Sequence, residues 1–550
     1  MHLKEDLIWD VDGKKDEFPK KIREIYFKNY VILRKKYTNW IGKISEPFSN
    51  DIDWWVSTPA SRNPNFSKIF DTICVLETIK KIKISNIKII TSSIELYDLI
   101  KLHFREKRIK VHLNKNRNDN KNLINFFHCI IFQTIIYIII NFFYKKKIPK
   151  NNKIVLINSY PTYNINKIER LFQFSKKFIK INKKKIVYIP TILANKNIFK
   201  VFGVINFLSK ENYVFKENLL YFRDLIYAFR HPTRVRKFKV KFTKYDQFDL
   251  SNLIYNELKS LKYFNAKMIG ILNYKFVERL KFKKTNISKT FCWLENHEQK
   301  GWSLGFRKFL PSVKTFGYQG FTNLPQLMNT IPTKFEEKFR VIPSTIVVSG
   351  KAYVKPRSEF YSKLNIKVGP SFIYNSVHRD FKINKKIKFL VILGEILSIN
   401  LSVLDWLYYS IKKNNDLVFY IKKPKLLNLD EFIDNKYIKK NIFFCEGNLS
   451  NFLKQAENVL VSGPTGSTLE SLAYNCKLII PKIDPYDSLN LSSVGAPKKM
   501  YKILNDKNKF SSYLNKINLK KKDNKNKLNL RKFRNHYFEK SSIKNENIFI

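Results

Sequence analysis

Short runs rich in β-branched and aromatic residues alternate with helical stretches along nearly the whole chain. This alternation is typical of parallel sheets whose faces are covered by helices. The chain has 550 residues and is 44% apolar, which is enough material for two or three separate cores. We therefore predict an α/β protein with more than one domain.

The apolar runs predict the strands and the domain boundaries. We expect strands at 52–58, 87–93, 109–113, 153–160, 185–193, 288–296, 313–320, 340–351, 388–395, 416–424 and 441–447, with another before residue 463. They predict two Rossmann-like domains that face a cleft: an N-terminal α/β domain over 1–345 and a C-terminal α/β domain over 346–515. The Lys- and Asn-rich residues 516–550 are expected to form a basic helix and tail.

Residues 122–144 contain no Lys, Arg, Asp or Glu. As a helix this segment would extend roughly 33 Å, enough to cross a bilayer core of about 30 Å. Basic residues flank it on both sides, so the positive-inside rule gives no orientation. We expect a hydrophobic helix inserted in the N-terminal domain as a monotopic or re-entrant membrane anchor. The alternative is a helix buried within the protein.

The formal charge of +58 favours anionic partners such as a membrane surface, nucleotide phosphates or a nucleic acid. Frequent Lys, Asn, Ile, Phe and Tyr with few Gly and Arg are also what AT-rich codons produce, whatever the function. No focused basic stripe with interleaved stacking aromatics is present, and no nucleic-acid-binding motif. We expect an anionic membrane surface as a partner and no nucleic acid.

Five cysteines are scattered through apolar runs without a CxxC pair, which is typical of a reduced intracellular protein without structural zinc. The first eighteen residues are too acidic for a secretory signal. The expected location is the cytoplasm, at the inner face of the cytoplasmic membrane.

The sequence VLVSGPTGSTLESLAYNC, residues 459–476, runs an apolar strand into a turn of small residues and then a helix. Small residues let a ligand approach the backbone, and first-turn N–H groups favour an anion. The candidate binding residues are Gly463, Thr465, Gly466, Ser467, Thr468 and Glu470, the last for a ribose. The alternative is an ordinary turn in which Ser467 or Thr468 caps the helix.

The run SGPTGSTLESLAYNCKLIIP, from residue 462 to 481, resembles the donor-site segment of glycosyltransferases of the GT-B fold. Together with 53–70, 293–309, 315–325 and 341–353 it resembles bacterial surface carbohydrate biosynthesis proteins of lipopolysaccharide or capsule assembly, over about residues 40 to 500. The chain departs from that pattern at Gly320 and Lys423, where relatives often carry histidine.

This resemblance implies transfer of a sugar from a nucleotide-activated donor to a surface polysaccharide or lipid-linked glycan. Such transfer requires stabilisation of the departing phosphate and, for inversion, a base for the acceptor hydroxyl. Glu295, His297 and Glu298 are the candidate catalytic residues, with Asp53 as a further candidate base. Lys422, Lys423 and Gly394 are added on the donor side, and Tyr318 and Gln319 on the acceptor side.

The sequence Asp-Ile-Asp at 51–53 matches a metal-binding D-x-D motif but lacks a preceding buried strand, and the segment 10–17 lacks the full spacing of a calcium loop. We predict a metal-independent enzyme with the nucleotide sugar as co-substrate and no other cofactor. Two alternatives stay open: transfer of a phosphorylated polyol from a CDP-activated donor, and a basic nucleic-acid-binding protein.

Overall fold

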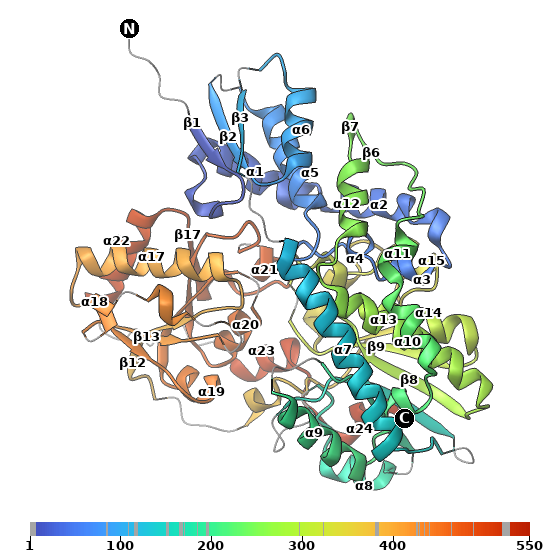
Figure 1. Ribbon diagram of the computed structural model, residues 1–550. Helices are drawn as coiled ribbons and strands as arrows, with labels where there is room; N and C mark the ends of the chain where they lie inside the picture. The colour runs from blue at the N-terminus through green and yellow to red at the C-terminus, as the bar shows by residue number, and fades with distance from the viewer. Residues whose placement is uncertain are drawn as a thin grey trace.

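The computed structural model describes most of the chain. The described residues are 7–83, 86–107, 109–114, 119–149, 153–163, 169, 171–183, 185–193, 197–295, 297–322, 324–379, 384–424, 427, 429–433, 435–438, 440–463, 465–487, 489–519 and 529–550. Within them lie three parallel β-sheets and one two-stranded antiparallel hairpin (Figure 1). The prediction of an α/β protein with parallel sheets is confirmed.

The N-terminal region has a small parallel sheet of its own, in the order β1-β2-β3. Its elements are β1 (Leu7–Asp10), α1 (Lys20–Ile32), α2 (Arg34–Ile44), α3 (Ile52–Trp55), α4 (Thr58–Ser61), α5 (Ile69–Lys81), β2 (Ile87–Thr91), α6 (Ile94–His103) and β3 (Ile109–Leu113). The strand predicted at 52–58 is wrong, because α3 and α4 occupy that segment. Trp54 and Trp55 point into the core as helical residues, so their apolar run reflects burial rather than strand pairing.

A second, six-stranded parallel sheet, called here the middle sheet, has the order β11-β10-β9-β8-β4-β5. Its strands are β4 (Ile154–Ser159), β5 (Ile186–Pro190), β8 (Ile287–Trp293), β9 (Lys314–Gln319), β10 (Thr345–Val348) and β11 (Ile366–Val368). The predicted boundary after residue 345 coincides with the start of β10 rather than with the end of this sheet.

The helices of this middle part run between and around its strands. They are α7 (Asp119–Phe143), α8 (Lys176–Asn182), α9 (Ile198–Lys210), α10 (Phe222–Phe229), α11 (His231–Val235), α12 (Ser251–Lys259), α13 (Phe264–Phe282), α14 (Glu298–Phe309), α15 (Lys334–Lys338) and α16 (Val354–Arg357). The short hairpin strands β6 (Lys244–Tyr245) and β7 (Phe248–Asp249) lie before α12. Helix α7 connects the small sheet to the middle sheet, so the apolar segment is helical as predicted.

The third sheet has the order β14-β13-β12-β15-β16-β17 and lies on the left of Figure 1. Its strands are β12 (Ile387–Ile392), β13 (Phe419–Lys422), β14 (Ile442–Phe444), β15 (Ala456–Val461), β16 (Lys477–Pro481) and β17 (Tyr501–Leu504). Its helices are α17 (Leu397–Lys413), α18 (Asn435–Ile438), α19 (Leu449–Leu453), α20 (Ser467–Ala473), α21 (Leu489–Ser492) and α22 (Lys507–Leu519). Every pair of strands is parallel, which agrees with the continuous apolar runs in β12 and β15.

The C-terminal segment returns to the middle sheet. Helices α23 (Leu530–Tyr537) and α24 (Ile543–Glu546) lead to Phe549, which is buried against Phe291 and Tyr318. The Glu539 N–H donates to the Ser349 carbonyl over 2.7 Å. Residues 529–550 are therefore packed against the body of the protein and link it to the third sheet.

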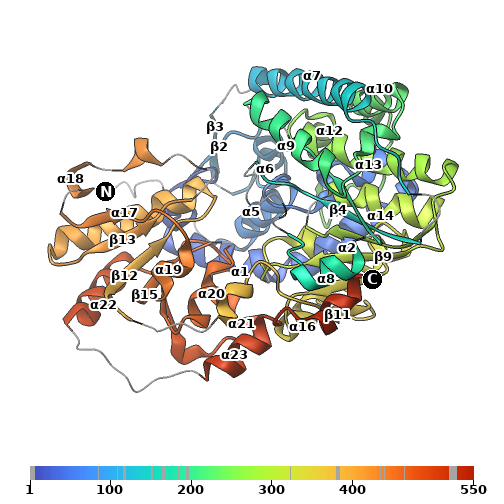
Figure 2. The ribbon, with the colours of Figure 1, turned by 90° about the horizontal axis from the view of Figure 1, so that it is seen from below.

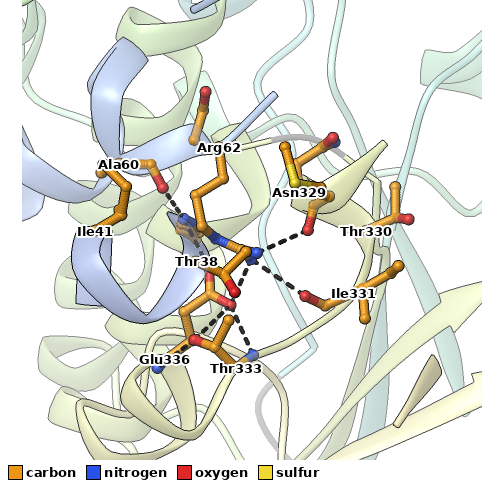
Figure 3. Close-up of polar contacts among 12 residues, drawn as sticks. Thr38, Ile41, Ala60, Arg62, Asn329, Thr330, Ile331, Thr333 and Glu336 are labelled. Carbon is orange, nitrogen blue, oxygen red and sulfur yellow. Dashed lines mark hydrogen bonds and ion pairs between the residues drawn. The ribbon is translucent and has the colours of Figure 1, made fainter. Parts of the chain in front are cut away.

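A buried ion-pair cluster, called here the Glu336 cluster, joins the N-terminal region to the middle part. Arg62 donates to the Glu336 carboxylate over 2.7 Å and to the carbonyls of Met328 and Ile331 (Figure 3). Lys300 pairs with the same carboxylate at 3.0 Å. The cluster holds the segment after α4 against the residues that follow β9.

Candidate functional site

The strand order of the third sheet marks where a ligand is expected. In chain order the strands read three-two-one-four-five-six across the sheet, and the direction of succession changes between β12 and β15. Ligands of open α/β sheets bind at the carboxyl ends of the strands at such a switch point. Gly394 follows β12, and residues 463–468 follow β15. The fold thus puts the predicted donor loop at the expected edge of the sheet.

The start of this loop is fixed by a buried carboxylate. Gly463 has φ of +77°, a left-handed conformation that favours glycine. Its N–H donates to Asp487 Oδ1 over 2.7 Å, and Ser462 Oγ donates to Asp487 Oδ2 over 2.8 Å. Burial and the neighbouring Asp484 raise the pKa of Asp487. The Gly463 N–H is therefore engaged by the protein, so that this residue shapes the turn.

The rest of the loop leads into α20 through its own hydroxyls. The Ser467 N–H donates to Thr465 Oγ1 over 3.2 Å, and Thr468 Oγ1 donates to the Thr465 carbonyl over 3.1 Å. Thr465 thus supplies the side-chain oxygen at the helix start that we expected from Ser467 or Thr468. Glu470 is half-buried, and burial raises its pKa to about 7.

The donor loop meets the segment that follows β9 of the middle sheet. A Cβ atom placed on Gly466 would lie 2.1 Å from the Tyr374 hydroxyl and 3.3 Å from Thr322 Oγ1. A side chain at this position would have to displace the Tyr374 hydroxyl. Residues predicted from separate motifs at 315–325 and 459–482 therefore come together where the two six-stranded sheets meet.

The two predicted acceptor-side residues are buried and largely engaged. The Gln319 amide donates to the carbonyls of Leu294 and Thr330, over 3.0 and 2.7 Å. The Tyr318 hydroxyl donates to the Pro370 carbonyl over 2.7 Å, and burial raises the pKa of Tyr318. Both side chains hold β9 and its neighbours in place next to the approach of Gly466 to Thr322.

The three predicted catalytic residues lie in different surroundings. Glu295 is half-buried just after β8 and accepts a hydrogen bond from Trp293 Nε1 over 2.6 Å. His297 is buried against the Phe66 ring, and burial with the nearby Lys300 lowers its pKa to about 3. Glu298 is buried at the start of α14. Of the three, only Glu295 is near enough for its charge to act on the pKa of Arg357, the cation described next.

Arg357 is a buried cation that no motif in the sequence singles out. Its guanidinium is 0% exposed and donates to Thr330 Oγ1 over 2.7 Å and to the Thr322 carbonyl over 3.3 Å. Within the described ranges, Nε has no hydrogen-bond partner and no carboxylate lies within ion-pair distance. Burial lowers the pKa of Arg357 to about 10, and the negative charge of Glu295 opposes this shift. Selecting Arg357 from the sequence would have required knowing that residues 354–357 pack beside Thr322.

The predicted donor-side lysines point to other partners. Lys422 donates to the Cys445 carbonyl over 3.1 Å, and Lys423 pairs with Asp430 and lies over the Phe444 ring. Strand β12 separates β13, which ends at Lys422, from β15. Gly394 exchanges two hydrogen bonds with the Asn400 side chain, at 3.0 and 2.7 Å, and so closes the turn before α17.

Asp53, the further candidate base, belongs to a separate buried cluster. Its carboxylate pairs with His231 at 2.7 Å and with Arg234 at 2.6 Å. Among the residues that the structure describes, no group of three or more His, Cys, Asp or Glu side chains could hold a metal ion.

No family model matches the chain, and no curated protein matches its sequence. Solved structures do show some similarity. The N-terminal domain of trehalose-6-phosphate phosphatase from Candida albicans aligns with a TM-score of 0.40 and 10% identity, covering 73% of this chain and 96% of that one. MnaA from S. aureus, solved with UDP, aligns at 0.39 and 10%, covering 71% and 92%. The UDP-forming α,α-trehalose-phosphate synthase from Burkholderia vietnamiensis aligns at 0.37 and 8%, covering 67% and 92%. These similarities are too low to assign a function to this chain.

Proposed function

We propose that the chain is a glycosyltransferase that moves a sugar from a nucleotide-activated donor to a surface polysaccharide or lipid-linked glycan. The observation that carries the proposal is the close approach of Gly466 to Thr322, whose carbonyl accepts a hydrogen bond from the Arg357 guanidinium. It joins a small-residue loop at a sheet switch point to a buried cation without a carboxylate partner among the described residues.

The donor diphosphate would lie against residues 466–468, with Arg357 as its counter-charge. A guanidinium in a buried site stabilises a departing phosphate far more than it would in water. The Tyr374 hydroxyl and Thr322 fill the space next to Gly466. We therefore propose that donor binding moves these two side chains aside and exposes Arg357.

Two carboxylates take the remaining roles in the proposal. Glu470 lies one turn into α20 and would accept hydrogen bonds from the ribose. Glu295 is the proposed base for the acceptor hydroxyl, because it is half-buried, accepts a hydrogen bond from Trp293 and acts on the pKa of Arg357 through its charge. Inversion would require such a base; retention would not.

A thermal-shift panel of UDP, GDP, CDP, CMP and dTDP tests the proposal. A nucleotide at 100 times its dissociation constant should stabilise the folded chain by about 2.7 kcal/mol. Ser467→Ala should remove that shift and leave the ligand-free melting temperature unchanged, since the Ser467 side chain is only half-buried. Gly466→Val is a poorer probe, because its side chain would collide with Tyr374 even without ligand.

The outcomes of the panel distinguish the glycosyltransferase from the polyol phosphotransferase. Absence of a shift with every nucleotide would refute the transferase. A shift with CDP and CMP, followed by release of CMP on turnover with a polyol-charged donor, would establish the phosphotransferase instead. We further propose that no metal is required, so that activity persists in excess chelator, and that the enzyme works at the cytoplasmic face of the membrane.

A further inference from the structure

Helix α7 lies on the surface with one side packed against the protein. Its inward residues Phe132, Ile136 and Ile140 are buried in a cluster with side chains of α9. Figure 2 shows the helix along one edge of the molecule. Of the described helices, α7 alone has the length and apolar composition needed to cross a membrane.

The polarity of α7 is inverted relative to an ordinary surface helix. The Gln133 amide is buried and donates to Glu217 Oε1 over 3.0 Å, and Asn141 donates to the Glu217 carbonyl over 3.1 Å. From Leu123 onward the exposed residues of α7 are apolar except for Asn125 and His128. The exposed apolar residues are Leu123, Ile124, Phe127, Ile131, Ile135, Ile138, Phe142 and Phe143.

Two helices that pack beside α7 expose further apolar side chains. Helix α10 flanks α7, with the Tyr137 and Phe222 rings 6.1 Å apart, and α9 packs on its inner side (Figures 1 and 2). Helix α9 exposes Phe199 and Phe207, and α10 exposes Phe222 and Ile226. We call the exposed side chains of these three helices, with residues 144–149, the α7 face.

The charge of the α7 face is almost entirely basic. Its exposed cations are Lys121, Lys145, Lys147, Lys200, Lys210, Arg223 and Arg230, whereas Glu211, directly after α9, is the one exposed acid among the described side chains of 119–149, 197–211 and 221–230. Anionic headgroups complement such a rim, since each basic residue near an anionic leaflet contributes about 1 kcal/mol. A second copy of this face would bring like charges together.

We propose that the α7 face docks on an anionic bilayer with α7 parallel to the membrane plane. Crossing the bilayer would break the Gln133 and Asn141 hydrogen bonds and expose the buried side of α7 to lipid. Because an amide without a hydrogen-bond partner in hydrocarbon costs free energy, the in-plane arrangement is favoured: it keeps the hydrogen bonds of Gln133 and Asn141. This inference does not rest on nucleotide binding.

Flotation of the full chain with phosphatidylcholine vesicles, with and without phosphatidylglycerol, tests the docking. Binding should require phosphatidylglycerol and weaken at high salt. The variant Ile131→Ser with Phe142→Ser should lose about tenfold or more in partition coefficient, because two exposed apolar anchors are removed. The matched control is Ile32→Ser with Phe242→Ser, since Ile32 is 59% exposed and Ile131 58%. Equal loss in both variants, or none in either, would overturn the proposal.

Depth measurements decide between docking and crossing. A fluorescent label on Ile124→Cys, Ile131→Cys or Phe142→Cys should be quenched to the same shallow depth by lipid-borne quenchers, because α7 lies in the plane. A label at 131 that lies deepest would show that the helix crosses the bilayer and would overturn the proposal. The wild type could instead fail to bind vesicles and form a dimer that Ile131→Ser abolishes. That result would overturn the proposal and show that the α7 face binds a second copy of the chain.

Discussion

Two fully buried arginines, Arg62 and Arg357, differ in what neutralises them. Arg62 is paired with Glu336 at 2.7 Å and also donates to the carbonyls of Met328 and Ile331. Arg357 donates to the Thr330 hydroxyl and the Thr322 carbonyl, both uncharged. Both sites are inside the protein, yet only the first has a carboxylate among the described residues.

This difference separates a structural pair from a candidate ligand site. A buried charge is expensive unless it is paired, and removing one partner leaves the other uncompensated. Arg62 and Lys300 share one carboxylate, so the cluster is built to remain closed. The positive charge of Arg357 is better satisfied when an anion joins it, which is the state we propose for the bound donor.

Breaking the Glu336 cluster should have the largest effect. Glu336→Ala leaves Arg62 and Lys300 buried without their carboxylate and should lower the free energy of unfolding by about 3 to 5 kcal/mol. Chemical denaturation of the variant and the wild type measures the difference. A change below about 1 kcal/mol would show that the pair is structurally dispensable.

The same cluster predicts how the free energy of unfolding decreases at acidic pH. Burial alone would raise the pKa of Glu336, but Arg62 and Lys300 lower it to about 2. Since the folded pKa is below the ordinary value of about 4.3, this contribution is complete above pH 5 and is lost as the pH falls toward 2. The wild type should lose about 3 kcal/mol over that range relative to Glu336→Gln.

Substituting Arg357 should have little effect on the stability of the ligand-free chain and a large effect on nucleotide binding. Arg357→Met removes an unpaired buried cation, so we expect the ligand-free stability to change by no more than about 1 kcal/mol. The nucleotide-induced shift should fall by about 2 kcal/mol, because a charge-assisted contact to phosphate is lost. Thermal denaturation with and without the best nucleotide of the panel measures both quantities.

A matched control comes from Arg34, which is 3% exposed and pairs with Glu359 at 2.7 Å. Arg34→Met should destabilise the ligand-free chain and leave the nucleotide shift intact. If Arg357→Met behaves in the same way while the wild type binds nucleotide, Arg357 is structural and the donor site lies elsewhere. If the wild type binds none, the transferase itself is refuted.

Local patterns were enough to predict most strands of the two large sheets, although β11 and β17 were not predicted. The apolar runs at 388–395 and 416–424 lie on β12 and β13, and the turn after β15 was found from its small residues. The strand predicted at 52–58 was wrong because a short helix that is buried on all sides and a buried strand both lack a regular alternation of apolar and polar residues. Strand β1, with four residues, carries too short a pattern to stand out.

The contacts that define the candidate site are long-range and were out of reach. Asp487 fixes Gly463 from beyond the next strand, and Arg357 reaches Thr322 from 35 residues further along the chain. Neither has a local motif that distinguishes it from other charged residues. Burial without a partner is a property of the folded chain, so the clearest feature of Arg357 exists only in three dimensions.

The smallest effect is expected at the predicted donor lysines. Lys422 and Lys423 extend toward Cys445 and Asp430, and β12 lies between their strand and the loop after β15. Two strand spacings amount to about 9.6 Å, near the Debye length at physiological salt, so little of their field reaches the loop. Lys422→Met and Lys423→Met should each change the nucleotide dissociation constant by less than about twofold, as measured by titration calorimetry. A tenfold loss for either would mean that the phosphate is held over β13, and the contrast between Arg357 and the paired cations would no longer identify the site.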